Sequence, residues 1–384
     1  MIGLARTDYG IFSDWWWTID RILLVLLTML IMVGYVMIFA ASPAIAQKLG
    51  IAIYHFAYKQ LVFLFLGVAI MFILSLLPPR KIYWLAFIGF ITMLSFMGLV
   101  LLSGDEVKGA QRWIRIAGFS LQPSEIVKPC FILLCACLFA RFGARGVFAS
   151  LLLLIPLGAL LIMQPDIGQL LLVCFVWGCM VFLIGGSLIT LGALSAIAMI
   201  GFGFLYHFMP HIRFRIDRFI DPSSGSHYQV EKAMEALSHG GLRGTGLGDG
   251  QIKWTLPDAH TDFVFAVAAE EGGFLLGAVI LAIFLAIILR VFYRLRSEKI
   301  YEIQLATGGL ITLFGIQAMI NLAVNLNLLP PKGMTLPFLS YGGSSMLGIS
   351  LTMGMILAFT RRRIGKNTTP KQNAPKNRKG GDVI

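Results

Sequence analysis

Long apolar runs are the feature of this sequence that most restricts its fold. A helix that crosses a bilayer needs about 20 mostly apolar residues. Ten runs approach or exceed this length, at residues 22–40, 56–77, 82–102, 124–141, 147–164, 168–185, 188–207, 263–290, 303–328 and 340–360. The chain is 58% hydrophobic and 13% charged, which excludes a water-soluble or disordered protein. The runs do not alternate as porin strands do. We predict an all-α polytopic membrane protein with about ten transmembrane helices.

The basic residues indicate how the chain is oriented. Ten spans place both termini on one side of the membrane. If that side is cytoplasmic, it holds 18 of the 31 Lys and Arg residues but only 6 of the 19 Asp and Glu residues. This bias follows the positive-inside rule, and it explains the net charge of +12 without nucleic acid as a partner. All five cysteines lie within apolar runs, so no disulfide framework is predicted.

The predicted spans divide the chain into five parts. Residues 1–21 form a cytoplasmic segment in which Trp15–Trp17 anchor the chain at the membrane interface. Spans 1–7 occupy residues 22–207 and spans 8–10 occupy 263–360, separated by a large outer loop at 208–262. The basic tail at 361–384 lacks apolar periodicity, and we expect it to be disordered.

The large outer loop carries the first candidate features. Its length, its aromatic residues and the amphipathic stretch from Tyr228 to Ser238 indicate a folded segment with one or two short helices. Gly240 to Gly250 reads GGLRGTGLGDG, which lacks the Gly-Lys-Ser/Thr ending of a P-loop. This stretch is either a tight turn between short helices or a backbone cradle for a phosphate.

Acidic residues mark the entry of the eighth predicted span. Asp258 and Asp262 are four residues apart, so on one helix they share a face, or they simply offset the helix dipole. His260 with Asp262 has loose metal-ligand spacing. Glu270 and Glu271 lie about two turns deeper, where an ionisable residue is either functional or part of a buried ion pair.

Two further polar groups adjoin predicted spans. Glu125 and Lys128 stand three apart at the start of the fourth span and can pair with each other. Asp166, in Gln164-Pro-Asp-Ile-Gly168, is most simply a helix cap between the fifth and sixth spans.

Six ordered motifs carry a resemblance to a known family. They are Arg112-Trp-Ile114, Gln122-Pro-Ser-Glu-Ile-Val-Lys128, Gln164-Pro-Asp-Ile-Gly168, Leu256-Pro-Asp-Ala-His-Thr-Asp-Phe263, Ala269-Glu-Glu-Gly272 and Leu336-Pro-Phe-Leu-Ser-Tyr-Gly-Gly-Ser-Ser345. Over roughly residues 15 to 360 the chain resembles the SEDS family (shape, elongation, division and sporulation) of bacterial cell-wall proteins. Lys332 and the entry Trp15 to Arg21 look more like the division branch than the elongation branch.

The resemblance implies a peptidoglycan glycosyltransferase of the inner membrane, at the division septum, with the large loop in the periplasm. Such proteins polymerise lipid II, an undecaprenyl-pyrophosphate-linked disaccharide-pentapeptide, together with a class B penicillin-binding protein and other division proteins. Asp262 matches the family's essential aspartate, and Glu125 and Lys128 match its polar pair. One departure is Pro129, which we expect to kink or restart the helix beside that pair.

The resemblance also assigns provisional roles. Asp262 is the expected catalytic carboxylate, either as a base or as the ligand of a divalent cation such as Mg²⁺ or Mn²⁺. The other candidates fall into a substrate-binding group and a supporting group. The first holds Lys128, Glu125, Arg243, Arg213, Arg112 and Ser340; the second holds Glu270, Glu271, Asp166 and Lys332.

Three alternatives stay open at the level of sequence. A lipid II flippase would also use intramembrane charges and broken helices, an elongation-branch polymerase would share the chemistry, and a scaffold would have no use for Asp262. The Ser340–Ser345 stretch either allows close helix packing or contacts substrate.

Overall fold

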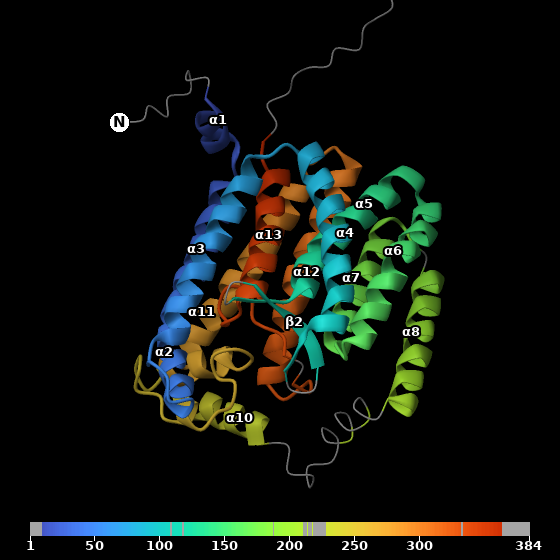
Figure 1. Cartoon of the computed structure of the whole chain (residues 1–384). Helices are drawn as coiled ribbons and strands as arrows, with labels where there is room; N and C mark the ends of the chain where they lie inside the picture. The colour runs from blue at the N-terminus through green and yellow to red at the C-terminus, as the bar shows by residue number, and fades with distance from the viewer. Residues whose placement is uncertain are drawn as a thin grey trace, which may run out of the picture.

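The computed structural model describes residues 10–107, 110–116, 119–186, 188–209, 213, 217, 228–331 and 333–362. Within these residues the chain forms a bundle of long helices, with a short helix α1 at one end (Figure 1). The helices are α1 (Ile11–Thr18), α2 (Arg21–Lys48), α3 (His55–Leu76), α4 (Pro79–Ser103), α5 (Pro123–Phe142), α6 (Ala144–Met163), α7 (Ile167–Leu183), α8 (Leu188–Phe208), α10 (Tyr228–Gly240), α11 (Val264–Leu295), α12 (Tyr301–Asn325) and α13 (Gly343–Phe359).

Ten of these described helices, α2 to α8 and α11 to α13, coincide with the ten predicted runs. Six of them, α2, α3, α4, α6, α11 and α12, are long and apolar enough to cross a membrane. The helices α7 and α13 are apolar but shorter, and α5 carries Glu125, Lys128 and Arg141. The helical membrane class is therefore confirmed, while the number of spans stays a prediction.

A small antiparallel sheet is the main difference from the all-helical expectation. Its strands β1 (Asp105–Val107), β2 (Ala110–Ile116) and β3 (Phe119–Leu121) are ordered β1-β2-β3 between α4 and α5. In the second pair Ile114 lies opposite Leu121. Trp113 and Ile114 favour extended backbone, but a search for long apolar runs does not detect so short a strand.

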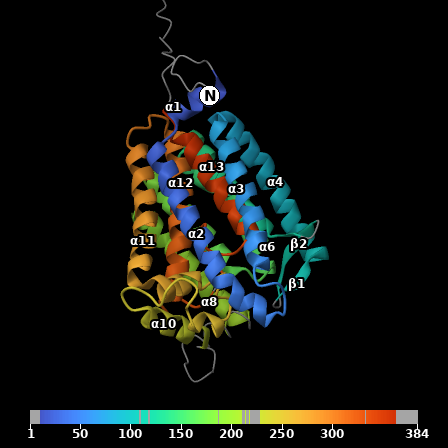
Figure 2. The ribbon, with the colours of Figure 1, turned by 90° about the vertical axis from the view of Figure 1, so that its left-hand side faces the viewer.

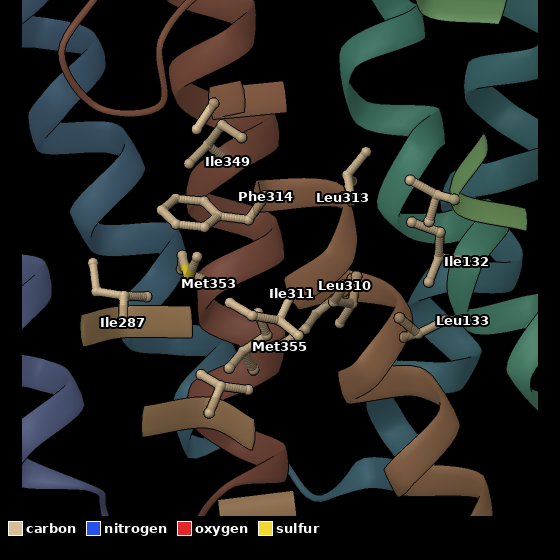
Figure 3. Close-up of a cluster of buried hydrophobic side chains, with 14 of the residues drawn as sticks. Ile132, Leu133, Ile287, Leu310, Ile311, Leu313, Phe314, Ile349, Met353 and Met355 are labelled. Atoms are coloured by element: carbon tan, nitrogen blue, oxygen red, sulfur yellow. The ribbon is translucent and has the colours of Figure 1, made fainter. Parts of the chain in front are cut away.

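The core of the bundle is built by α5, α12 and α13. Ile132 and Leu133 of α5, the Leu310–Phe314 turn of α12, and Ile349, Met353 and Met355 of α13 interlock with Ile287 of α11 (Figure 3). The remaining long helices surround this centre and expose large apolar side chains outward, as expected where lipid replaces water.

The two ends of the bundle carry different structural elements. Figures 1 and 2 place α1 and the end of α13 at one end of the molecule, and α10 at the other. Contacts support this placement, because Arg361 Nε donates to Thr18 Oγ1 at 2.9 Å. Both ends of the described chain therefore lie on one side. The opposite end gathers the loops and helix starts that carry most of the candidate site residues.

Candidate functional site

Asp262 lies in the turn that leads into α11. The backbone reverses at Asp258, whose φ is 51°, and the Asp262 N–H donates to the Asp258 carbonyl at 3.2 Å. The Asp262 residue is half-buried, and its carbonyl accepts from the side-chain amides of Asn321 and Asn325 of α12, each at 2.9 Å. The main chain of Asp262 is thus fixed by α12, while the residue keeps some exposure.

Glu125 and Lys128 form a buried ion pair in the first turns of α5. Lys128 Nζ lies 2.9 Å from Glu125 Oε2, and both residues are at least 95% buried. Lys128 also donates to Gln169 Oε1 of α7 at 2.7 Å and to Gln317 Oε1 of α12 at 3.5 Å. Gln169 completes the cluster by donating to Glu125 Oε1 at 2.6 Å. The pair suggested by the sequence therefore forms, at a point where three helices meet.

Of the two outcomes expected at Pro129, a kink or a restart of the helix, the restart does not occur. The helix α5 runs without interruption from Pro123 to Phe142. A proline at this position leaves the Glu125 carbonyl without its usual donor four residues on. Gly348 of α13 packs so closely there that an added Cβ would lie 2.6 Å from that carbonyl oxygen. A glycine on α13 therefore allows that helix to approach the backbone of Glu125 closely.

Arg112 and Asp166 tie the small sheet to the turn between α6 and α7. Arg112 Nε donates to the Gln164 carbonyl at 2.8 Å, another guanidinium nitrogen donates to the Pro165 carbonyl, and Nη1 lies 3.6 Å from Asp166 Oδ1. Asp166 stands at the start of α7, as predicted for a cap, but its carboxylate accepts from Gln122 Nε2 at 3.1 Å. Burial raises the pKa of Asp166, and the Arg112 charge offsets part of that rise.

The segment around Ser340 joins the start of α13 to the Asp262 turn. The Tyr341 N–H donates to the His260 carbonyl at 2.7 Å, and the Ser340 carbonyl accepts from Gln60 of α3 at 3.2 Å. Ser344 Oγ accepts from the Gln122 N–H at 2.7 Å. The segment includes Phe338 at φ 64°, a conformation that bulky residues rarely adopt and that tends to occur at functional sites.

Glu270 and Glu271 hold the glycine-rich turn and do not contact Lys128. Glu270 Oε1 accepts from the N–H groups of Gln251 and Ile252, each at 2.7 Å, at the start of the short helix η2 (Ile252–Trp254). Glu271 pairs with buried Lys253 at 2.5 Å and accepts from the Gly248 N–H at 3.1 Å. Part of the N–H cradle considered for a phosphate is therefore occupied by the chain's own carboxylates.

The glycine-rich turn fits against a break in α11. Gly273 has φ 68° inside that helix, and a Cβ there would lie 2.4 Å from the Gly244 nitrogen. The turn connects α10 with η2, which matches the predicted short helices of the loop. Arg243 lies on its exposed side.

Of the other predicted residues, one lies apart from the cluster and one is not described. Arg213 is exposed and pairs with Asp217 at 3.5 Å, and Lys332 falls outside the described residues, as do residues 363–384 of the predicted tail. Within the described part of the chain, no three His, Cys, Asp or Glu side chains gather as a metal site. The candidate roles of Arg243, Arg213 and Ser340 stay predictions.

Several buried amides that the sequence analysis did not single out connect the site. Gln317, Asn321 and Asn325 are spaced by four residues along α12, so they form one stripe. The stripe touches Lys128 at one end and the Asp262 carbonyl at the other. Asn and Gln at this spacing in an apolar span indicate a buried polar stripe. A search for charged groups alone does not detect it.

Comparison with known proteins places this arrangement in a family. The family model of FtsW, RodA and SpoVE, described as cell cycle proteins, matches residues 20–364. A probable peptidoglycan glycosyltransferase FtsW of Caulobacter vibrioides is 41% identical over 367 residues, covering 94% of each chain. One from Coxiella burnetii is 33% identical over 359 residues, covering 89% of this chain and 96% of that protein.

Solved structures agree with this placement. A chain in a peptidoglycan synthase complex, described as coordinating polymerization and crosslinking, superposes with a TM-score of 0.73 at 28% identity, covering 89% of this chain and 97% of that one. Thermus thermophilus RodA gives 0.67 at 28% identity, covering 90% and 97%. The chain therefore belongs to the SEDS family of multi-pass membrane proteins. Within that family it is FtsW-like.

Proposed function

We propose that this protein is a peptidoglycan glycosyltransferase that polymerises lipid II, with Asp262 as its catalytic carboxylate. The observation that carries the proposal is the placement of Asp262. It is half-buried at a helix start, its backbone is anchored by two buried amides, and the same α12 stripe reaches Lys128. The names of the FtsW relatives supply the reaction class.

The proposed chemistry transfers a glycan from its lipid pyrophosphate to a sugar hydroxyl. The acceptor hydroxyl oxygen bonds to the anomeric carbon of the donor, the bond from that carbon to the pyrophosphate oxygen breaks, and the hydroxyl proton passes to a base. Asp262 is the base, or the ligand that positions a divalent cation. Lys128 is the nearest candidate along the α12 stripe to stabilise the negative charge of the leaving pyrophosphate.

The partners and the location complete the proposal. A solved synthase complex contains a chain similar to this one, so we propose that a class B penicillin-binding protein crosslinks the strands that this chain makes. The FtsW relatives favour the division branch, and hence the septum of the inner membrane. Membership in a fold family does not by itself establish activity, so the reaction needs a direct test.

The test is polymerisation by the purified full-length protein, with and without its class B synthase. Lipid II is incubated with wild type, Asp262→Ala and the control Asp249→Ala, which replaces an exposed carboxylate of the glycine-rich turn, and glycan chains are resolved on a gel. We expect polymer from wild type and from the control, and at least 100-fold less from folded Asp262→Ala. Loss of polymer with EDTA would favour the cation-positioning role.

Absence of polymer would argue against the glycosyltransferase function. If the wild-type protein with its partner made no polymer, the glycosyltransferase proposal would fail. Lipid II translocation in vesicles would then test the flippase alternative.

A further inference from the structure

A polar stripe on α12 sets the position of Asp262. Gln317, Asn321 and Asn325 are all at least 99% buried in a helix whose other inward side chains are largely apolar. Burying an amide costs free energy unless its donors and acceptors are paired. Each of these amides is hydrogen-bonded, and the partners of Asn321 and Asn325 include the Asp262 carbonyl.

Asn325 occupies an unusual place in the hydrogen bonding of α11. Its Nδ2 donates to the Asp262 carbonyl at 2.9 Å, and its Oδ1 accepts from the Ala266 N–H at 3.1 Å. In a continuous helix these two backbone groups would bond to each other, since they belong to residues four apart. The Asn325 amide stands between them. It satisfies one of the donors that a helix start leaves unpaired, and it keeps Asp262 outside the helix.

Asn321 reinforces the same arrangement from one turn away. Its Nδ2 donates to the Asp262 carbonyl at 2.9 Å and to the Met334 carbonyl at 2.7 Å. The Asn325 amide also donates to the Asn321 carbonyl at 2.9 Å, so the two asparagines orient each other. The segment before Ser340 and the turn before α11 are therefore both joined to one face of α12.

The stripe ends at the other charged candidate. Gln317 lies one turn before Asn321; its Oε1 accepts from Lys128, and its Nε2 donates to the Thr335 carbonyl at 3.2 Å. One rigid helix thus contacts both the cation of α5 and the backbone of the carboxylate residue. Successive members of the stripe are separated by about 6 Å along the axis.

We propose that Asn321 and Asn325 are positioning residues for Asp262, and that α12 fixes the separation between the Asp262 carboxylate and the Lys128 ammonium. The inference rests on the proposed function, because it assigns the asparagines a role in that reaction. They act through the Asp262 backbone and not through its carboxylate. A displacement of about 1 Å in a reacting group can lower a rate about 100-fold.

The experiment replaces the amides and separates turnover from binding. Asn325→Leu and Asn321→Leu remove the bonds to Asp262 at similar side-chain volume. Thr307→Val is the matched control, because Thr307 is buried in the same helix and its hydroxyl has no hydrogen-bond partner among the described residues. Each purified variant is assayed with lipid II and the class B synthase for kcat and KM, and its melting temperature is measured in detergent.

We expect both leucine variants to lose at least 10-fold in kcat while KM stays within about twofold, since the groups that bind lipid II are unchanged. The control should keep its wild-type kcat. If Asn325→Leu does not fold, Asn325→Ser replaces it. Its loss in kcat should be smaller, because a hydroxyl can still donate, but it should still exceed that of Thr307→Val.

Two results would overturn the inference. One is a wild-type kcat in a folded asparagine variant. The other is a loss no greater than that of Thr307→Val. An inactive wild-type protein would instead reject the proposed function, so the two failures are distinguishable.

Discussion

At the residue scale, the site depends on charges that are buried together. Lys128 and Glu125 are only 2% and 5% exposed. Taking two charges out of water is costly, and a buried pair survives because each charge compensates the other. The surrounding amides of Gln169 and Gln317 occupy further donor and acceptor positions of the pair. A substitution of one partner therefore has two effects, on stability and on chemistry, which must be separated.

A double variant at Lys128 and Glu125 separates the effect on stability from the effect on chemistry. Lys128→Met alone should lower stability by about 3–5 kcal/mol, because it leaves the Glu125 carboxylate buried and uncompensated. Lys128→Met combined with Glu125→Gln should recover most of the melting temperature in detergent. Glycan synthesis should stay at least 10-fold below wild type if Lys128 stabilises the leaving pyrophosphate. Wild-type synthesis by the double variant would show that the pair is structural only.

At this scale the sequence located the charged residues and the pairing of Glu125 with Lys128, but not the amides that surround them. Glu125 and Lys128 stand out because ionisable groups are rare in apolar runs, and Asp262 stands out at the entry of a span and through the family resemblance. Neutral amides do not stand out in the same way. The rotation of α12 relative to α5 and α11 decides which amide contacts which charge. That rotation cannot be predicted from the sequence of any one helix.

At the element scale, buried polar contacts join the ends of helices. Asp20 begins α2 by accepting from the N–H groups of Ile22 and Leu23. It also binds Arg290 at 2.9 Å, and it binds Arg294, both near the end of α11. Burial raises the pKa of the Asp20 carboxyl, but the hydrogen bonds from the two arginines and the Leu23 N–H, together with the charge of Arg294, bring the pKa below its usual value.

This shift gives a pH-dependent prediction. A depressed pKa means that the Asp20 contribution to stability is complete above about pH 4, the ordinary value, and is lost as pH falls through the lower native value. Asp20→Asn should therefore lower the melting temperature in detergent at pH 7, with a cost of roughly 3 kcal/mol. The difference from wild type should shrink below about pH 4.

Asp14→Asn is the control, because Asp14 is exposed on α1. We expect this variant to have the melting temperature of the wild-type protein. A difference for Asp20→Asn that grows as the pH falls would contradict this account of the α2 and α11 contact.

The helices themselves followed from apolar run length, but their irregularities did not. The sheet between α4 and α5 and the break at Gly273 were not predicted. A glycine is required at the break because the backbone of the glycine-rich turn leaves no room for a side chain. A Cβ at Gly273 would lie 2.5 Å from the Leu242 carbonyl oxygen. Such an approach involves segments about 30 residues apart and is invisible to local periodicity.

At the scale of the whole molecule, the structure gives the bundle two different ends. One end joins α1 to the end of α13, and the other carries α10, the glycine-rich turn and the Asp262 turn (Figure 2). The excess of basic residues around the first end predicts that it is cytoplasmic. We then expect the end that carries the candidate site to face outward.

Cysteine labelling tests this orientation. Leu247→Cys, on the exposed part of the glycine-rich turn, should react with a membrane-impermeant maleimide in intact spheroplasts. Arg145→Cys, exposed in the first turn of α6, should react only after lysis. The parent protein measures the background from its own five cysteines. The reverse labelling pattern would invert the predicted topology.

The sequence by itself determined the class of protein, the approximate position of its ten long helices and the identity of its charged residues. These are local properties, since a helix that meets lipid must be long and apolar along its own sequence. Only the tertiary structure decided that Glu270 and Glu271 hold the glycine-rich turn, that Arg112 binds the turn before α7, and that Asn325 holds Asp262 outside α11. Those contacts join residues 17 to 63 positions apart, so they depend on how the helices pack against one another.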